Sequence, residues 1–360
     1  MKRSRKLWNT VRASLVGLLI SVFLLVFLVR KTGRIDEIHR VNNEISPAAE
    51  GDTVRAIQKH PTFETYDMKD GKSCNDSCQE EIQRTRQSHL SKACKSKLSS
   101  ETSIREVDSS FVKGLDHVYV VDKHKLLFCY VPKVACTNWK RIILMLMGEI
   151  SPSSNLHHLE IHNIASKTIP TLRKYAVKDV VQRLNDYTKV LFVREPISRL
   201  VSAYRDKLET PKNSDSRAFR QIYSARIKGI NLKEIGIGHR PEFNTTFYEF
   251  ISYLASPSNK LDLVGEEHWR TIDELCRPCD LQYDFIGRME TLHRDTDYVI
   301  RRILQKSAEH FRIYDPTNFT NSSSAFILQD YIADIPDRKL KALTKRFQID
   351  FEAFNYKQPT

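Results

Sequence analysis

The chain has 360 residues, of which 41% are hydrophobic and 9% aromatic, a composition that supports a folded core and excludes a wholly disordered chain. Its 57 lysine and arginine residues exceed its 44 acidic residues, so that the formal net charge is +13. A basic excess of this size serves general solubility or the binding of an anionic polymer, nucleic acid included.

The first element in chain order is an uncharged apolar run at residues 13–29. Its length lies at the short limit for a membrane span. A cleaved signal peptide is the alternative, but the run ends at Arg30-Lys31 without a small-residue cleavage site. Basic residues are more frequent before the run than after it. We therefore expect a cytosolic tail at 1–12, a signal-anchor at 13–29 and a lumenal remainder.

The segment after the span is polar, charged and weakly periodic from residue 30 to residue 111, which indicates a stem with one helix at 79–98. The folded domain is expected at 112–360. Four glycosylation sequons lie beyond the span, in agreement with a lumenal remainder, and their asparagines are Asn75, Asn244, Asn318 and Asn321.

A buried-strand pattern at 126–131 leads into the most informative segment of the chain. The loop holds a lysine and a threonine, and an amphipathic helix follows it at 139–147. Loop N–H groups, a helix amino end and an ammonium together form a cradle for a phosphate. The loop contains no glycine, which disfavours an ordinary P-loop NTPase or a kinase. Its residues are Pro132, Lys133, Val134, Ala135, Cys136, Thr137 and Asn138.

A second buried-strand pattern at 189–193 ends in Arg194, and a helix is predicted at 197–207. Ligands of open α/β sheets bind at the carboxyl ends of the strands, where Arg194 lies. An arginine and a serine beside a phosphate cradle suit a nucleotide that has a second, separate phosphate. The candidate residues are Arg194, Glu195, Pro196, Ile197, Ser198, Arg199, Leu200, Val201 and Ser202.

The remaining elements complete the predicted fold. A hairpin is expected around Lys123-His124, and a short strand at 284–287. Strands that alternate with helices indicate a three-layer α/β domain with a mostly parallel sheet. Further helices are predicted at 179–184, 246–254, 290–304 and 336–347.

The two motifs together resemble the Golgi carbohydrate sulfotransferases, and most closely the chondroitin 4-O-sulfotransferase branch. The likeness runs from about His117 to Tyr356. It implies a P-loop-like fold, 3′-phosphoadenosine 5′-phosphosulfate (PAPS) as donor and no metal. Residues 132–138 would bind the 5′-phosphosulfate, and residues 194–202 the 3′-phosphate. The acceptor would be a glycosaminoglycan or another glycan and not nucleic acid, and the protein would be a single-pass type II Golgi membrane protein.

Within this resemblance the acceptor stays open. Chondroitin or dermatan GalNAc is favoured by the motifs, while a GalNAc-terminated N-glycan or glucuronic acid is the alternative. Residues 213–242 diverge from the chondroitin pattern and are a candidate for the specificity region. A non-catalytic glycosaminoglycan-binding protein would explain the basic charge but not the two donor motifs.

Sulfuryl transfer requires a group for the leaving phosphate and a base for the acceptor hydroxyl. Lys133 is expected in the first role, because a flexible ammonium is a mobile donor. His162 is our candidate base, since related uronyl sulfotransferases carry a base histidine between the two donor motifs. His268 matches a His-Trp pair of the family and is the other candidate, and His157 and His158 are nearby competitors.

The seven cysteines are consistent with an oxidising lumen. Cys276 and Cys279 could form a redox pair or half of a zinc site, but structural disulfides are favoured, with partners undetermined. Cys129 lies in the apolar strand pattern and is expected as a buried thiol. Cys136 lies in the donor loop, where we expect its small size to matter more than its chemistry.

Overall fold

The computed structural model describes residues 74–100, 107–209, 214–230, 244–256, 266–307, 311 and 325–359, all within one compact unit, Tyr66–Thr360. Within these ranges no helix combines the length and the apolar character that crossing a bilayer needs. The predicted span at 13–29 lies outside the described residues, as do the sequons at Asn318 and Asn321. Asn75 and Asn244 are described and exposed.

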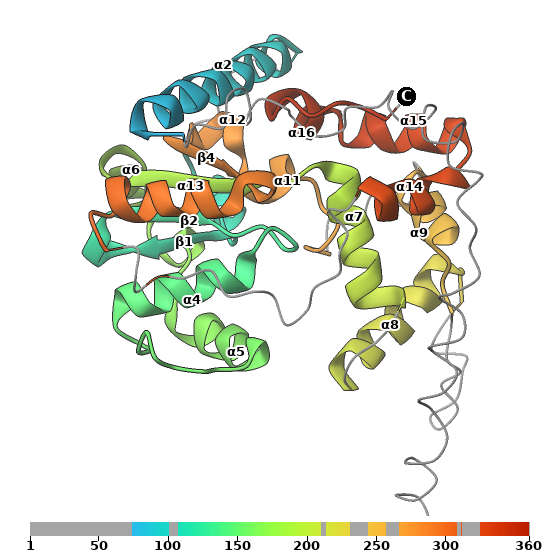
Figure 1. The fold of residues 1–360 in the computed structure, drawn as a ribbon, viewed down its shortest axis with the longest axis horizontal. Coiled ribbons are helices and arrows are strands. Elements are labelled where there is room, and N and C mark those ends of the chain that lie inside the picture. The colour runs from blue at the N-terminus through green and yellow to red at the C-terminus, as the bar shows by residue number, and fades with distance from the viewer. Residues whose placement is uncertain are drawn as a thin grey trace, which may run out of the picture. The chain divides into compact units, whose positions relative to one another are not determined.

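A four-stranded mixed sheet forms the centre of the domain (Figure 1). Strands β1 (Val118–Val121) and β2 (Leu126–Cys129) form the predicted hairpin, and β3 (Thr188–Val193) and β4 (Phe285–Arg288) continue the sheet in parallel with β2. Nearly every strand residue is buried, so helices and loops cover both faces, as expected for a three-layer α/β domain.

Helices follow the strands as the apolar periodicity predicts. Those nearest the carboxyl ends of β2 and β3 are α4 (Cys136–Met147) and α7 (Pro196–Tyr204), and a π-helical turn, η5 (Arg205–Glu209), continues α7. A π turn inside a helix is frequent at functional sites. The other helices of this half are α3 (Ser109–Lys113), η3 (Asp122–His124), α5 (His158–Thr168), η4 (Leu172–Lys174), α6 (Val177–Asp186) and α8 (Ser214–Ile227).

The C-terminal half adds a second apolar cluster beside α7, packed around Trp269, Phe250 and Phe347. Thr246 caps α9 through a reciprocal capping box with Glu249, which explains why that helix begins where the sequence predicts it. The helices are α9 (Phe247–Leu254), α11 (Ile272–Cys276), α12 (Pro278–Leu281), η7 (Met289–Thr291), α13 (Leu292–Tyr298), η8 (Val299–Ile303), α14 (Ala325–Ala333), α15 (Asp337–Arg346) and α16 (Gln348–Ala353).

The predicted stem helix exists as α2 (Asp76–Ser100), and it packs along β4, the edge of the sheet (Figure 1). The Gln83 side chain donates to the Ile286 carbonyl at 3.0 Å and accepts from the Ile286 N–H at 2.9 Å. Gln83 thus makes the two hydrogen bonds that a further strand would make. An exposed edge is a site of unwanted strand pairing, and α2 closes it with side chains.

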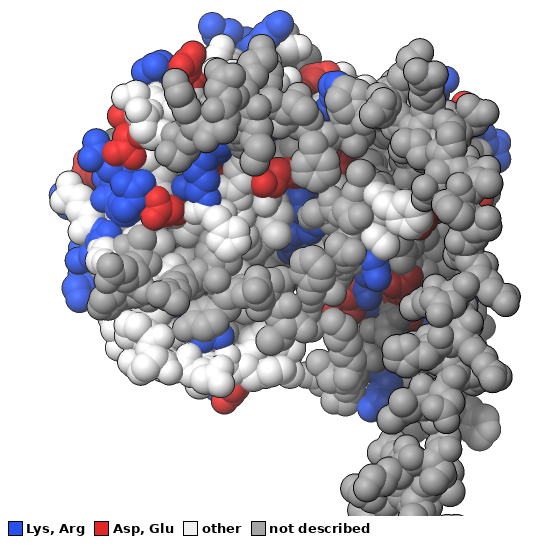
Figure 2. Space-filling view, viewed as in Figure 1, with Lys and Arg blue, Asp and Glu red and all other residues white. Residues whose placement is uncertain are grey.

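A buried ion pair fastens α2 to the domain. Asp295 is fully buried and accepts from Arg86 at 2.7 Å, from Gln79 at 2.9 Å and from the Arg288 N–H at 2.8 Å. Surface pairs add to the contact, among them Arg302 with Asp76 at 3.2 Å. On the face shown in Figure 2, basic and acidic side chains are interspersed on the side that carries α2 and α13 in Figure 1.

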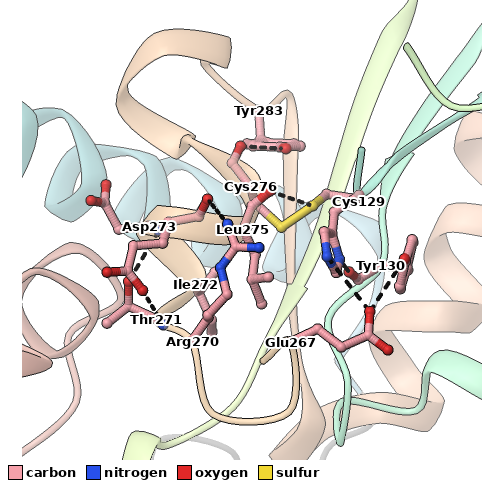
Figure 3. The surroundings of a disulfide bond; sticks show 12 residues. Cys129, Tyr130, Glu267, Arg270, Thr271, Ile272, Asp273, Leu275, Cys276 and Tyr283 are labelled. Carbon is pink, nitrogen blue, oxygen red and sulfur yellow. Dashed lines mark hydrogen bonds and ion pairs between the residues drawn. A yellow bond between two sulfur atoms is a disulfide. The ribbon is translucent and has the colours of Figure 1, made fainter. Parts of the chain in front are cut away.

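Three disulfides complete the domain. Cys94 of α2 pairs with Cys279, and Cys74 pairs with Cys78. The prediction of a buried thiol at Cys129 is wrong: the end of β2 lies 5.8 Å (Cα–Cα) from Cys276, and the two are bonded (Figure 3). Structural disulfides at Cys276 and Cys279 are confirmed, although the two do not pair with each other. Cys136 is unpaired.

The Arg86–Asp295 pair gives a test of how firmly α2 is held. Arg86→Met leaves Asp295 buried without its main counterion, so we expect a loss of about 3–5 kcal/mol in the free energy of unfolding. Arg84→Met is the matched control on the exposed side of the same helix. The measurement is urea denaturation of the two variants. An equal, small effect from both would show that the helix is held only loosely.

Candidate active site

The donor loop joins β2 to α4 with an unusual backbone. Lys133 and Ala135 have positive φ angles of 70° and 50°, although neither is glycine. Each such residue costs on the order of 1–2 kcal/mol and persists only when its surroundings enforce it. Ala135 is the N-cap of α4 and offers no side-chain cap. The amino end of this twelve-residue helix therefore lacks a capping side chain at Ala135, and such a helix end suits an anion.

Two guanidinium groups, one within α7 and one just before it, hold the backbone of this loop in its conformation. Arg199 Nε donates to the Pro132 carbonyl at 3.0 Å, and Arg194 Nη1 donates to the Lys133 carbonyl at 3.0 Å. The carbonyl and the N–H of one trans peptide point in opposite directions. Holding the Pro132 carbonyl therefore turns the Lys133 N–H away from Arg199. The two sequence motifs are therefore in direct contact.

Lys133 extends into a small group of charges. Its ammonium lies 3.1 Å from the carboxylate of Asp206, and Lys207 approaches the same carboxylate at 3.4 Å. Burial lowers the pKa of Lys133, and Asp206 opposes that change. Burial also acts to raise the pKa of Asp206, but the two lysines outweigh it and lower this pKa to about 2. Sequence reasoning did not single out Asp206, although the Arg-Asp-Lys run directly after the α7 motif placed it there.

The α7 segment carries the residues of the second motif. Glu195 caps α7 by accepting from the N–H groups of Ile197 and Ser198, so its carboxylate is engaged locally. Burial raises the pKa of Glu195. Arg194, Ser198 and Ser202 are buried polar groups, of which Arg194 directly follows β3. The side chains of Ile197, Leu200 and Val201 pack in the apolar cluster around Trp269.

His162 reaches the donor loop from α5. Its Nε2 lies 2.9 Å from Thr137 Oγ1, and its Nδ1 lies 3.1 Å from Lys140 Nζ. An ammonium can only donate, so Nδ1 accepts, and in the neutral ring Nε2 carries the proton and donates to Thr137. Burial and then the nearby Lys140 lower the pKa of His162 to about 3. The ring is therefore neutral, with both nitrogens engaged.

His268 has the opposite arrangement. Its Nδ1 is hydrogen-bonded to Glu266 Oε1, which also accepts the His268 backbone N–H at 3.0 Å. Because a carboxylate fixes the proton on Nδ1, Nε2 keeps its lone pair, and nothing else among the described residues bonds to it. Burial lowers the pKa of His268, and Glu266 opposes that change. The charges of His268 and Lys207 affect one another, and both act on Asp206, so these groups share one site.

The other residues of the first motif have structural places. Trp139 is buried against Phe128 and Phe192, in agreement with a packing role. Lys140 and Arg141 are both buried. Lys140 lies over the Tyr130 ring and bonds to His162, whereas Arg141 donates to loop carbonyls that precede α5.

Comparison with known protein families shows the family to which the chain belongs. The model of the Sulfotransferase family matches residues 116–357. The chain belongs to the sulfotransferase family. That stretch contains both motifs, the sheet, His162 and His268.

The curated relatives of this sulfotransferase are carbohydrate sulfotransferases. Carbohydrate sulfotransferase 12 of Xenopus laevis is 32% identical over 297 residues, which cover 78% of this chain and 70% of the relative. Carbohydrate sulfotransferase 9 of Homo sapiens is 32% identical over 281 residues, covering 78% and 61%. Carbohydrate sulfotransferase 11 of Rattus norvegicus is 34% identical over 252 residues, covering 68% of each chain. No solved structure gave a significant match.

Membership of the family implies PAPS as the sulfate donor and a glycan as the acceptor. The chemistry of the donor loop fits such a donor, because the loop and the start of α4 combine a helix amino end without a side-chain cap, the Lys133 ammonium and the Thr137 hydroxyl. Arg194 is near enough to contact the same loop. Within the described ranges, no group of three His, Cys, Asp or Glu side chains is arranged to hold a metal ion.

The depressed pKa of Asp206 predicts a pH-dependent contribution to stability. Its folded pKa of about 2 lies below the ordinary value of 3.8, so the contribution is full above pH 4 and is lost as the pH falls toward 2. Asp206→Asn should therefore cost about 2 kcal/mol of unfolding free energy at pH 7, and the difference from wild type should shrink between pH 4 and pH 2. Urea denaturation across this range is the measurement. A difference that is constant with pH would contradict the ion pair.

Proposed function

We propose that this sulfotransferase transfers the sulfuryl group of PAPS to the 4-hydroxyl of GalNAc in chondroitin or dermatan. The observation that carries the enzymatic part is the contact between the two motifs: the left-handed donor loop, with Lys133 upon it, is held by Arg194 through a single carbonyl. The acceptor assignment rests on the resemblance of the motifs to the chondroitin 4-O branch and on the chemistry of the acceptor side.

The roles of the donor-side residues follow from their positions. PAPS, when bound, supplies a sulfuryl group whose bond to the 5′-phosphate oxygen is broken. Lys133 Nζ is the ammonium that stabilises the charge left on that oxygen, and Asp206 holds it in place beforehand. The N–H groups at the start of α4 and the Thr137 hydroxyl bind the 5′-phosphate. Arg194 and Ser202 bind the 3′-phosphate.

His268 is the base that the geometry favours. Its Nε2 takes the proton of the acceptor hydroxyl while the new oxygen–sulfur bond forms, and Glu266 stabilises the resulting imidazolium. His162, the first candidate from the sequence, donates from Nε2 to Thr137 and accepts at Nδ1 from Lys140. Neither nitrogen is open to an acceptor in this arrangement. We assign His162 the task of orienting the Thr137 hydroxyl, whose own proton then points to the donor.

The acceptor side of the site is aromatic and basic. The Phe219 ring of α8 meets the His268 ring edge-on at 5.7 Å between centroids, and Lys207 Nζ lies 5.6 Å from the centroid of Phe219. An aromatic face packs against the C–H face of a sugar, and an ammonium beside it attracts a carboxylate. Phe219 belongs to the diverging segment 213–242. These two residues support an acidic glycan, such as one that contains uronic acid, as the acceptor.

The resemblance also supports a cellular arrangement. We propose a Golgi membrane protein of single-pass type II topology, with the span at 13–29, a stem from residue 30 and the catalytic domain in the lumen. The three disulfides favour an oxidising compartment. The α2 helix is the part of the predicted stem that is packed on the domain.

An acceptor panel tests the proposed function. The domain, secreted without the predicted span at 13–29, is incubated with PAPS in four separate reactions, one for each acceptor. The acceptors are desulfated chondroitin, desulfated dermatan, a GalNAc-terminated N-glycan and a glucuronyl-terminated glycan. Disaccharide analysis of the products should show sulfate at the 4-position of GalNAc in chondroitin or dermatan. Transfer to only the N-glycan or only the glucuronyl-terminated glycan would contradict the proposed acceptor but not sulfate transfer from PAPS. Lack of transfer to all four acceptors would contradict both the acceptor and the reaction.

Lys133→Ala should lower the transfer rate at least a hundredfold, because one preorganised donor at a developing charge is worth about two to three factors of ten. Lys123→Ala, in the exposed hairpin turn, is the matched control. Adenosine 3′,5′-bisphosphate should still raise the melting temperature of the variant, which reports an intact fold. Activity of the Lys133 variant within a few-fold of the control would contradict the role assigned to Lys133 at the leaving oxygen.

The two histidines give separable outcomes. His268→Ala should lower kcat by about a hundredfold or more, since general base catalysis contributes about two to four factors of ten. His162→Ala should mainly raise the KM for PAPS. In the parent enzyme kcat/KM should rise with pH through a pKa below 6.5, because burial lowers the pKa of His268 and only the neutral ring accepts a proton. The reverse ranking of the two variants would identify His162 as the base.

A further inference from the structure

Arg199 is a fully buried charge that bonds to carbonyl groups. The side chain rises from the middle of α7 and is 1% exposed. Its Nε donates to the Pro132 carbonyl at 3.0 Å and its Nη2 to the Glu267 carbonyl at 3.0 Å, while Nη1 donates to the Arg270 carbonyl. All three nitrogens of the guanidinium are thereby engaged with backbone. A phosphate would have to displace these contacts to reach the group.

The three carbonyls belong to the two halves of the reaction site. Pro132 begins the donor loop that carries Lys133. Glu267 and Arg270 stand on either side of His268 in the sequence. One rigid, planar group therefore sets the distance between the residue at the leaving oxygen and the residue at the acceptor hydroxyl. Because an in-line transfer is sensitive to displacements of about 1 Å, that distance bears directly on the rate.

The same two segments are joined a second time, farther from the reacting groups. Cys129, just before the donor loop, is bonded to Cys276 at the end of α11 (Figure 3). Between the disulfide and the guanidinium, the Tyr130 hydroxyl donates to the Glu267 side chain at 3.3 Å. Asp350 fixes the start of α11 by accepting from the Ile272 N–H at 2.7 Å. The disulfide holds the core end of this pair of segments, and Arg199 holds the end at the site.

We propose that Arg199 is a positioning residue that aligns the donor loop with the His268 segment, and that it is not a ligand of the donor phosphates. The inference rests on the proposed function in one respect, the role of His268 as base. It changes the place of Arg199 in the second motif, where the resemblance had put the whole run 194–202 against the 3′-phosphate. Burial lowers the pKa of Arg199 to about 10, so the group remains a cation at neutral pH.

Lysine cannot replace Arg199 in this role. Three carbonyls in different directions require the fork of N–H groups that a guanidinium has, and an ammonium at the end of a flexible chain reaches one or two of them. A phosphate ligand behaves differently, because a lysine keeps the charge but loses the fork of N–H groups, so the loss falls on nucleotide binding more than on kcat. The conservative substitution therefore separates alignment from anion binding.

The test compares Arg199→Lys with Arg194→Lys in the secreted enzyme. Arg199→Lys should lower kcat at least tenfold and change the Kd for adenosine 3′,5′-bisphosphate less than threefold. Arg194→Lys should instead weaken nucleotide binding more than it lowers kcat. A Kd for the Arg199 variant that rises as much as that of the Arg194 variant would overturn the proposal and make Arg199 a phosphate ligand.

A double-mutant cycle with His268→Ala separates this inference from the proposed base. If Arg199 acts by aligning His268, then Arg199→Lys should lower kcat less than threefold further in the His268→Ala enzyme. Full additivity would refute the alignment. A near-normal His268→Ala enzyme would refute the assigned base instead, and the kcat and Kd comparison of the preceding test would still judge Arg199.

Folding of the variants is part of the test. Arg199→Gln removes the buried charge and keeps one amide N–H pair for the carbonyls, so it takes the place of the lysine variant if that variant is not recovered folded. Thermal unfolding, measured with and without the nucleotide, shows whether each variant is folded. Failure of both Arg199 variants to fold, while Arg194→Lys folds, would show a purely structural role and overturn the proposal.

Discussion

The left-handed donor loop is the constraint on which the site depends. Without glycine, positive φ angles at Lys133 and Ala135 are unfavourable, and the loop keeps them because its carbonyls are bonded to buried arginines. The consequence is geometrical: the loop that carries Lys133 leads directly into the start of α4, where Thr137 lies. A glycine-rich loop would adopt the same shape at lower cost, but it would depend less on the neighbouring helix. Here the second motif holds the first in shape.

The charges around this loop determine the protonation states of the groups that we propose to take part in sulfuryl transfer. Two lysines flank one carboxylate, so the Asp206 pKa is about 2 and the ion pair is complete at neutral pH. Both histidines have lowered pKa values and are neutral there. What distinguishes them is the partner at Nδ1, an ammonium for His162 and a carboxylate for His268. An identical ring thus becomes a hydrogen-bond donor in one place and a proton acceptor in the other.

Much of this could be predicted from the sequence, and the failures have physical reasons. The strands and the two donor motifs follow from local apolar patterns and turn chemistry, and those are local properties. The partner of Cys129 and the pairing of Asp206 with Lys133 depend on contacts between distant segments, which no local pattern encodes. For Arg199 our proposal departs from the sequence prediction, which places it with the phosphate ligands because an arginine in such a motif resembles its neighbour Arg194. Only the direction of each guanidinium distinguishes the two.

The packing of α2 on β4 has a consequence for any shortened form of this protein. A fragment that starts at residue 112 would leave Cys279 with an unpaired thiol, since its partner Cys94 would be gone. It would also leave the backbone of Ile286 without the Gln83 amide and open to pairing with another polypeptide. Such a fragment would tend toward mixed disulfides and aggregation in a secretory host. A fragment that keeps both contacts has to include α2 and therefore begins well upstream of the first strand.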